Sequence, residues 1–320
     1  MRVSDPAELL TAARSGDRGA IARLISYVER GGEPAASVSR LTWSAASDAN
    51  LIGLTGAPGA GKSTLTNALV RHVRASTAGR VGVLAIDPSS PFTNGAILGD
   101  RVRMQDHFTD DGVFIRSMAT RGHIGGLALA TPEAARVLAA VGYPTVLIET
   151  VGVGQVEVEI AGAADTTVVV VNPGWGDAVQ ANKAGLLEVA DVFVINKADR
   201  PGVAEVHRDL EAMLDMHTSP GPWRPPVIET VAAKNEGAAE LWEAIEKHRA
   251  HMVETGELER RQAKRATSEV REIIVRTIEA RAVSALRSEA GAALCERVTN
   301  GEIDPHSAAE TILKEQISDA

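Results

Sequence analysis

The chain has 320 residues, of which 44% are hydrophobic, and this is enough for one large α/β domain with appendages or for two domains. Its net charge of −9 argues against nucleic acid as the main ligand, and its single cysteine, Cys295, excludes a disulfide framework or a multi-cysteine metal site within one chain. Residues 1–10 have no apolar core after a basic start, as a signal peptide would, and no apolar run reaches the about 18 residues of a membrane span. We therefore expect a soluble, cytoplasmic protein with neither nucleic acid nor a membrane as a partner.

Residues 1–45 are predicted to form a helical N-terminal extension. Apolar residues recur at helical spacing between Asp5 and Arg30, and the glycines at 16 and 19 are expected to divide this stretch into two helices. The segment from Gly31 to Pro34 then stops the helical pattern.

The middle of the chain, residues 46–255, alternates apolar strand candidates with helical stretches. Strands are predicted at 50–55, 81–86, 113–117, 145–149, 166–172, 191–196 and 226–230. Helices are predicted at 62–75, 131–141, 178–189, 203–216 and 237–251. This alternation predicts an α/β fold with three α/β/α layers, in which helices cover both faces of a mostly parallel sheet.

Residues 256–320 are predicted to form a helical arm. No strand candidate follows Gly256, and a long helix is expected before two shorter ones near 289–298 and 305–316. The long helix has an apolar stripe made of Leu258, Val270, Ile273, Ile274, Ile278, Val283 and Leu286. Because a terminal helix cannot easily bury such a stripe within its own domain, we expect the arm to form a homodimer. The basic residues of the helix are predicted to form a solvated face; they are Arg260, Arg261, Lys264 and Arg265.

The segment after the first predicted strand matches the phosphate-loop pattern G-x-x-x-x-G-K-[ST] at every position. Its glycines would let backbone N–H groups wrap a polyphosphate, and the following helix N-terminus adds a partial positive charge. Lys62 would reach the β- and γ-phosphates, and Ser63 would ligate Mg²⁺. The residues expected at the nucleotide are Gly56, Ala57, Pro58, Gly59, Ala60, Gly61, Lys62, Ser63 and Thr64.

A second motif, Asn196-Lys197-Ala198-Asp199, follows an apolar strand and favours guanine over adenine. The Asp199 carboxylate can accept hydrogen bonds from N1–H and the 2-amino group of guanine. Adenine has neither donor, so a site built around this carboxylate rejects adenine. Asn196 would support the loop, and the stem of Lys197 would cover one face of the ring.

The segment from Thr230 to Lys234 follows a further predicted strand. It resembles the segment of GTPases whose backbone N–H contacts guanine O6, with Ala232 in place of the usual serine. Ala232 and Ala233 are therefore added to the expected nucleotide contacts.

The sequence Glu149-Thr150-Val151-Gly152 ends a strand and has the form of the D-x-x-G switch of GTPases, with Glu in place of Asp. Its carboxylate would hold Mg²⁺, directly or through water, and the Gly152 N–H would sense the γ-phosphate. Val153 stands where Ras-like proteins carry a water-orienting glutamine, so hydrolysis by the chain alone should be slow unless Gln155 or a partner supplies that group. We expect catalytic roles for Lys62, Glu149 and Gly152.

Four further residues are candidates for the metal shell or for switching. Asp87 ends the second strand and Asp100 follows a glycine-rich loop, so either acid could reach the metal, although both could also be turn or cap residues. Gln180 and Lys183 lie in a polar segment after the strand that ends near Asn172, and they could report the nucleotide state to a partner or belong to an ordinary surface helix.

Together these motifs resemble the MeaB/ArgK family, the methylmalonyl-CoA mutase-associated GTPases, which belong to the SIMIBI class of P-loop proteins. The motifs that carry the resemblance are Gly56–Ser63, Ile86–Ser90, Arg116–Leu127, Glu149–Gln155 and Asn196–Asp199. The run R-S-M-A-T-R-G-H-I-G-G-L at Arg116–Leu127 is the most specific of them, and the resemblance extends over nearly the whole chain.

The resemblance implies a P-loop NTPase fold and a homodimer that uses the C-terminal arm. It implies a GTPase that binds GTP or GDP with Mg²⁺ and escorts an adenosylcobalamin-dependent methylmalonyl-CoA mutase by gating cofactor loading and by protecting or reactivating the enzyme. By position it suggests a Mg²⁺ environment of Ser63, Asp87, Asp100 and Glu149, and a third switch that contains Gln180 and Lys183. Because Ala57 and Pro58 stand where many members of the class carry a second lysine, the nucleotide-sandwiched dimer of that class is not carried over.

Three alternatives remain at this point. A metallochaperone GTPase for a nickel enzyme would usually show clustered histidines or cysteines, and this chain has eight scattered histidines. An ATP-dependent kinase linked to amino-acid transport fits poorly with the guanine motif. A scaffold that binds nucleotide without turnover is conceivable because the glutamine after the switch is absent.

Overall fold

The structure is a computed structural model that describes residues 4–45, 49–87, 107, 109–119, 126–150, 162–174, 189–216 and 222–318. The chain forms two compact units, Met1–Arg265 and Ala266–Ala320. The first unit contains the sheet and the motifs described above, and the second is helical.

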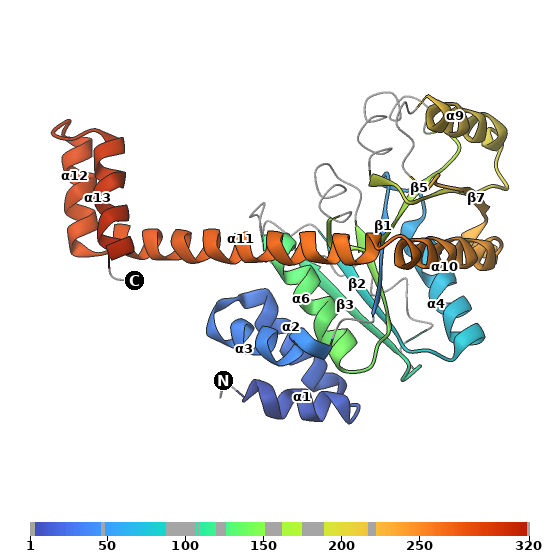
Figure 1. The fold of residues 1–320 in the computed structure, drawn as a ribbon, viewed down its shortest axis with the longest axis horizontal. Coiled ribbons are helices and arrows are strands. Elements are labelled where there is room, and N and C mark those ends of the chain that lie inside the picture. The colour runs from blue at the N-terminus through green and yellow to red at the C-terminus, as the bar shows by residue number, and fades with distance from the viewer. Residues whose placement is uncertain are drawn as a thin grey trace. The chain divides into compact units, whose positions relative to one another are not determined.

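The first unit is built on a seven-stranded sheet in which every neighbouring pair of strands is parallel (Figure 1). The strands are β1 (Asn50–Thr55), β2 (Val81–Asp87), β3 (Val113–Ala119), β4 (Thr145–Thr150), β5 (Thr166–Val171), β6 (Val192–Asn196) and β7 (Val227–Thr230). Their order is β3-β2-β4-β1-β5-β6-β7. The predicted α/β fold is confirmed, and each predicted strand lies within about two residues of an observed one.

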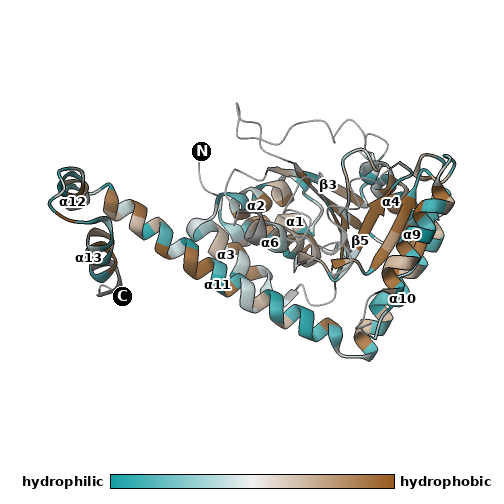
Figure 2. Ribbon diagram, turned by 90° about the horizontal axis from the view of Figure 1, so that it is seen from above, coloured by the Kyte–Doolittle hydropathy of each residue, from teal (hydrophilic) through white to brown (hydrophobic). Residues whose placement is uncertain are grey.

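Helices cover both faces of this sheet, which explains why the strands are apolar throughout (Figure 2). Successive strand residues point to opposite faces, so Val83 packs with α4 (Lys62–Thr77) and α10 (Ala238–Glu254), whereas Leu84 packs with α2 (Arg18–Arg30) and α6 (Gly126–Ala140). On β5 and β6 the second face packs against α9 (Val203–Asp215). The result is the expected three-layer arrangement.

The N-terminal extension contains three helices rather than two. The helices α1 (Pro6–Arg14) and α2 begin at the caps Asp5 and Asp17, whose carboxylates accept backbone N–H bonds. The helix α2 ends where the sequence predicts, at Gly31, whose φ is +74°. A third helix, α3 (Gly32–Thr42), follows at once and was not predicted. Pro34 lies in its first turn, where the missing N–H costs nothing.

Partly buried ion pairs join the start of α11 (Glu257–Leu286) to the amino ends of β5 and β6. Arg261 donates two hydrogen bonds of 2.9 Å to the carboxylate of Asp191, which precedes β6. Arg265 pairs with Asp165, which precedes β5. His248 of α10 lies with its Nε2 atom 3.2 Å from the Asp191 carboxylate. We call these five residues the amino-edge cluster; all of them belong to the first unit.

The prediction of a solvated basic face is therefore wrong for two of its members. The side chains of Arg261 and Arg265 are 31% and 16% exposed. Arg260 is 64% exposed and pairs with Glu257 one turn earlier on the same helix, as a surface residue would. Sequence spacing could not separate these arginines, because their partners lie about 70 and 100 residues away in the chain.

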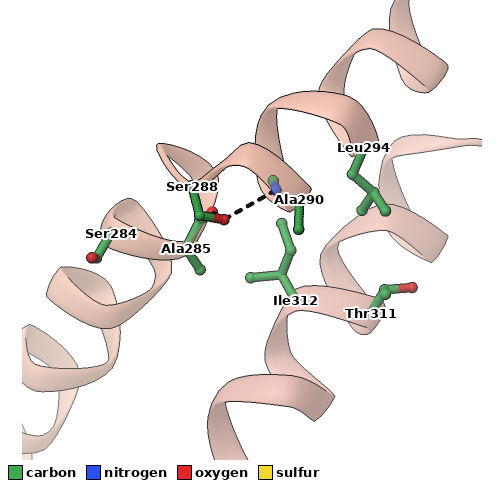
Figure 3. Close-up of a pocket in the computed structure, with 8 residues that line it drawn as sticks. Ser284, Ala285, Ser288, Ala290, Leu294, Thr311 and Ile312 are labelled. Carbon is green, nitrogen blue, oxygen red and sulfur yellow. Dashed lines mark hydrogen bonds between the residues drawn. The ribbon is translucent and has the colours of Figure 1, made fainter.

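The second unit contains the remainder of α11 together with α12 (Glu289–Thr299) and α13 (Pro305–Ser318). The apolar residues of α11 alternate with polar ones along the helix (Figure 2), and Val270, Ile274 and Ile278 are about half exposed. A small pocket lies between the end of α11, α12 and α13, with Ile312 of α13 facing Ala285 and Ala290 (Figure 3). None of the helices in the described part of the chain combines the length and hydropathy that crossing a membrane requires.

Candidate functional site

The phosphate-loop segment forms a tight turn between β1 and α4, and its conformation requires glycine at two positions. Gly56 has φ +134°, and a Cβ atom there would lie 2.1 Å from the carbonyl oxygen of Val170. Gly61 has φ +95°, and a Cβ atom there would lie 2.3 Å from Nδ2 of Asn196. Another residue would require a shift of the backbone at Gly56 and of the Asn196 side chain at Gly61, and the positive φ at both positions also favours glycine. The loop is therefore pressed against β5 and the guanine motif at the same time.

Lys62 holds its ammonium against this loop. The side chain is buried, and Nζ donates hydrogen bonds to the carbonyl oxygens of Gly56 at 2.5 Å and Ala57 at 3.0 Å. A cation is thus placed within the turn, beside the N-terminus of α4. Cation and helix N-terminus together form the electrostatic environment that a polyphosphate needs.

The fold brings Ser63 and Glu149 together, although 86 residues separate them in sequence. Glu149 lies on β4, which pairs with β1 at Leu54, so the carboxylate faces the first turn of α4. The Ser63 hydroxyl donates to Oε1 of Glu149 at 2.5 Å. The hydroxyl of Thr66, one turn further along α4, contacts the other carboxylate oxygen, Oε2, at 3.0 Å. Glu149 is 4% exposed.

Asn196 connects the phosphate loop with the segment after β7. Its Nδ2 atom donates to the carbonyl oxygen of Ala60 at 2.9 Å. Its Oδ1 atom accepts from the backbone N–H of Ala232 at 3.2 Å and from the hydroxyl of Thr230 at 3.1 Å. Asn196 thus links two loops through hydrogen bonds of its side chain.

Lys197 and Asp199 lie beside this connection. Lys197 has φ +59° and donates from Nζ to the carbonyl oxygen of Gly59 at 2.6 Å. Asp199 pairs with Lys234 at 3.4 Å, and both side chains are about half exposed. Lys234 ends the short 3₁₀ turn Ala232–Lys234, in which Ala232 is buried. The guanine motif, this turn and the phosphate loop therefore meet at the carboxyl edge of the sheet, where ligands of such sheets bind.

Several predicted residues cannot be placed in this way. Asp100, Gly152, Gln155, Gln180 and Lys183 lie outside the described residues. Asp87 is the last residue of β2, next to β4, and its side chain also lies outside what the structure describes.

Two residues that the structure places at this site were not assigned a role from the sequence. Thr66 contacts Glu149, and Thr230 contacts Asn196. The spacing of Ser63 and Thr66 contained a signal, because residues three apart on a helix lie on the same face. Thr230 ends a strand next to β6, and only the pairing of β6 with β7 brings it to Asn196.

Comparisons with known proteins identify the family of this chain. Residues 21–287 match the family model of the methylmalonyl-CoA mutase-associated GTPase MeaB. A Pyrococcus abyssi protein named as a GTPase is 48% identical over 97% of this chain and 96% of its own length. The mouse mitochondrial homologue of methylmalonic aciduria type A protein is 37% identical over 65% of this chain and 51% of its own length.

A solved structure shows the same fold. The crystal structure of a LAO/AO transport system kinase matches with a TM-score of 0.70 and 24% identity, covering 99% of this chain and 100% of that one. Because the family model spans most of the chain and the relatives are named as GTPases, the chain belongs to the MeaB family of methylmalonyl-CoA mutase-associated GTPases and is itself a GTPase.

Proposed function

We propose that this GTPase uses Mg²⁺ and acts as a chaperone for an adenosylcobalamin-dependent methylmalonyl-CoA mutase, gating cofactor loading or protecting and reactivating the enzyme. The mutase is suggested by the description of the family and by the name of the mouse relative. The observation that carries the nucleotide chemistry is the contact between Ser63 and Glu149 beside Lys62.

The residues at this point suit Mg²⁺. A serine hydroxyl and a carboxylate are hard oxygen ligands of the kind that Mg²⁺ prefers, and both are buried where Glu149 of β4 meets Ser63 at the start of α4. Ser63 and Glu149 would hold the ion, directly or through water, with Asp87 and Asp100 as further candidates. When bound, the ion would neutralise charge that develops on the phosphates.

The remaining steps of GTP binding and hydrolysis would rely on groups of the chain itself. Lys62 would exchange its bonds with the loop carbonyls for phosphate oxygens and, with the loop N–H groups, stabilise the transferring phosphoryl group during in-line attack by water. The Asp199 carboxylate would accept from guanine, and the backbone near Ala233 would face O6. Because valine follows Gly152, we expect slow turnover by the chain alone, with Gln155 or the mutase completing the site.

Partner communication and assembly belong to the same proposal. Gly152 would sense the γ-phosphate, and Gln180 and Lys183 would pass the nucleotide state to the mutase. The half-exposed apolar residues of α11 support a homodimer formed through residues 256–320, because a second copy would remove them from water. The helical extension at 1–45 and the GTPase domain at 46–255 complete the proposed division of the chain.

A kinase linked to amino-acid transport is the second candidate. The name of the solved structure with the same fold favours it. The segment Asn196-Lys197-Ala198-Asp199 counts against it, because the Asp199 carboxylate would select guanine over adenine.

The decisive experiment measures GTP turnover by the purified chain, with and without a methylmalonyl-CoA mutase and its cofactor. We expect slow basal turnover that rises when the mutase is added. Lys62→Ala should abolish turnover, whereas Lys247→Ala, which removes an exposed lysine of α10, should leave it unchanged. Turnover that the mutase does not alter would contradict the chaperone proposal, and faster turnover of ATP than of GTP would favour the kinase.

A further inference from the structure

Both oxygens of the Glu149 carboxylate are contacted by hydroxyl groups of one helix. Ser63 contacts Oε1 at 2.5 Å, and Thr66 contacts Oε2 at 3.0 Å. The two residues lie three positions apart on α4, on the side that faces β4. Thr66 is 0% exposed, so its hydroxyl has no access to solvent.

The length of Glu149 makes the second contact meaningful. Glutamate has one more rotatable bond than the aspartate usually found at this switch, so one more torsion angle must be fixed to hold its carboxylate in place. Thr66 is β-branched, and its Oγ1 atom also lies 3.0 Å from the carbonyl oxygen of Lys62, which restricts its rotamer. The hydroxyl of Thr66, whose rotamer is restricted, therefore contacts the carboxylate at the end of the more flexible Glu149 side chain.

We propose that Thr66 is a positioning residue of the Mg²⁺ site, which holds Oε2 of Glu149 so that Oε1 stays beside Ser63. This inference rests on the proposed function, since it concerns the metal of that site. Thr66 contacts Glu149 and the carbonyl oxygen of Lys62, and we expect its effect on the metal to pass through Glu149. In this arrangement Thr66 compensates for the replacement of aspartate by glutamate.

Removal of the Thr66 hydroxyl should weaken metal binding without weakening metal-free nucleotide binding. Partners that orient a metal ligand typically change metal affinity by about 10–100-fold when they are removed. Thr66→Val keeps the shape of the side chain and deletes the hydroxyl, and Thr66→Ser restores it. We expect Thr66→Val to need about tenfold more Mg²⁺ for the same effect.

A matched control is available in the N-terminal extension. Thr42 is 1% exposed and donates from Oγ1 to the carbonyl oxygen four residues earlier, at 2.9 Å, as Thr66 can. The hydrogen bonds of its hydroxyl go to backbone carbonyls of α3. Thr42→Val therefore reproduces the loss of a buried hydroxyl and of its backbone bond, but not the loss of the Glu149 contact.

The test uses the intact chain and the release rate of a fluorescent N-methylanthraniloyl GDP, measured in EDTA and across a Mg²⁺ titration. We expect equal rates for all variants in EDTA. The Mg²⁺ concentration that halves the rate should rise about tenfold for Thr66→Val and stay near wild type for Thr66→Ser and Thr42→Val. The inference would be overturned if Thr66→Val accelerates GDP release by the same factor in EDTA as in Mg²⁺, because this result would indicate a purely structural role for Thr66.

Two further outcomes separate this inference from the function on which it rests. If wild type responds to Mg²⁺ and Thr66→Val responds identically, the inference is wrong and the Mg²⁺ site stands. If wild type releases GDP at a rate that Mg²⁺ does not change, the proposed metal site itself fails.

A second variant keeps the test decisive if Thr66→Val folds poorly. Glu149→Asp shortens the side chain by one methylene, so its carboxylate cannot span both hydroxyls. Thr66→Ser/Glu149→Asp should then behave as Glu149→Asp alone, and Thr66→Ala should add less to Glu149→Asp than it does to wild type. Full additivity of the two changes would overturn the inference.

Discussion

Arg261→Gln tests whether the amino-edge cluster stabilises the first unit. Arg261 joins the start of α11 to Asp191 through two hydrogen bonds of 2.9 Å, and it also donates to the carbonyl oxygen of Asp165 at 2.9 Å. Glutamine is shorter and uncharged, so it can form neither the ion pair nor the paired contact. The carboxylate of Asp191 would keep the backbone N–H of Thr167, at 2.8 Å, and His248 as partners.

The expected loss lies between those of a surface and a buried ion pair. Removal of one member of a fully buried pair costs about 3–5 kcal/mol, whereas exposed pairs contribute about 0–1 kcal/mol. The Asp191 side chain is 8% exposed, but Arg261 is 31% exposed and water screens part of the interaction. The remaining partners of Asp191 also limit the penalty. We therefore expect a loss of about 2–3 kcal/mol in the free energy of unfolding.

Tryptophan fluorescence during thermal and urea unfolding is the assay. All four tryptophans precede residue 266, so the signal reports the first unit, and Trp223 donates to the carbonyl oxygen of Asp191 at 2.8 Å. The expected loss should lower Tm by roughly 4–12 °C. Arg260→Gln is the matched control on the same helix, and it should change stability by less than about 0.5 kcal/mol. Equal effects of the two changes would refute the reasoning.

The effect of Arg261→Gln should depend on pH in a defined direction. Burial raises the pKa of the Asp191 carboxyl, but the hydrogen bonds from His248 and Arg261 outweigh it, and the folded pKa lies below the usual value. A lowered folded pKa contributes stability above the unfolded pKa of about 4, and the contribution is lost as the pH falls through the folded value. The difference in the free energy of unfolding between wild type and Arg261→Gln should therefore be largest near pH 7 and decrease below about pH 4. A difference that grows in acid would contradict this sign.

Three further changes test the nucleotide site. Gly61→Ala should abolish measurable GDP binding in a fluorescence titration, because its Cβ would lie 2.3 Å from Nδ2 of Asn196; binding at wild-type strength would show that the loop adapts. Asp199→Asn should shift the preference from GTP to XTP in competition assays, since an amide replaces the carboxylate acceptor, and retained GTP preference would refute the guanine assignment. Lys183→Ala should leave basal turnover nearly intact and reduce stimulation by the mutase, and unchanged stimulation would remove the third switch.

Much of the fold follows from local patterns. The strands are short runs of valine, isoleucine and leucine, and both faces of a parallel sheet are covered, so continuous apolar runs identify them without knowledge of their neighbours. The phosphate loop and the guanine motif are contiguous segments, so their residues were predictable from spacing alone. The unpredicted helix α3 shows the limit of this reasoning. Its buried residues are Ala35, Val38 and Thr42, and only two of them are apolar, which is too few to mark an apolar helical period.

The contacts across the fold required the tertiary structure. Thr66 and Glu149 are 83 residues apart, and Arg261 and Asp191 are 70 apart. Nothing in the sequence near Arg261 distinguishes it from the solvated Arg260 on the same helix. The sequence by itself determined which segments become strands, helices and binding loops, because those depend on neighbours along the chain. Strand order and helix packing decided which charged and hydroxyl groups meet, because burial of a charge is favourable only where the fold brings a partner to it.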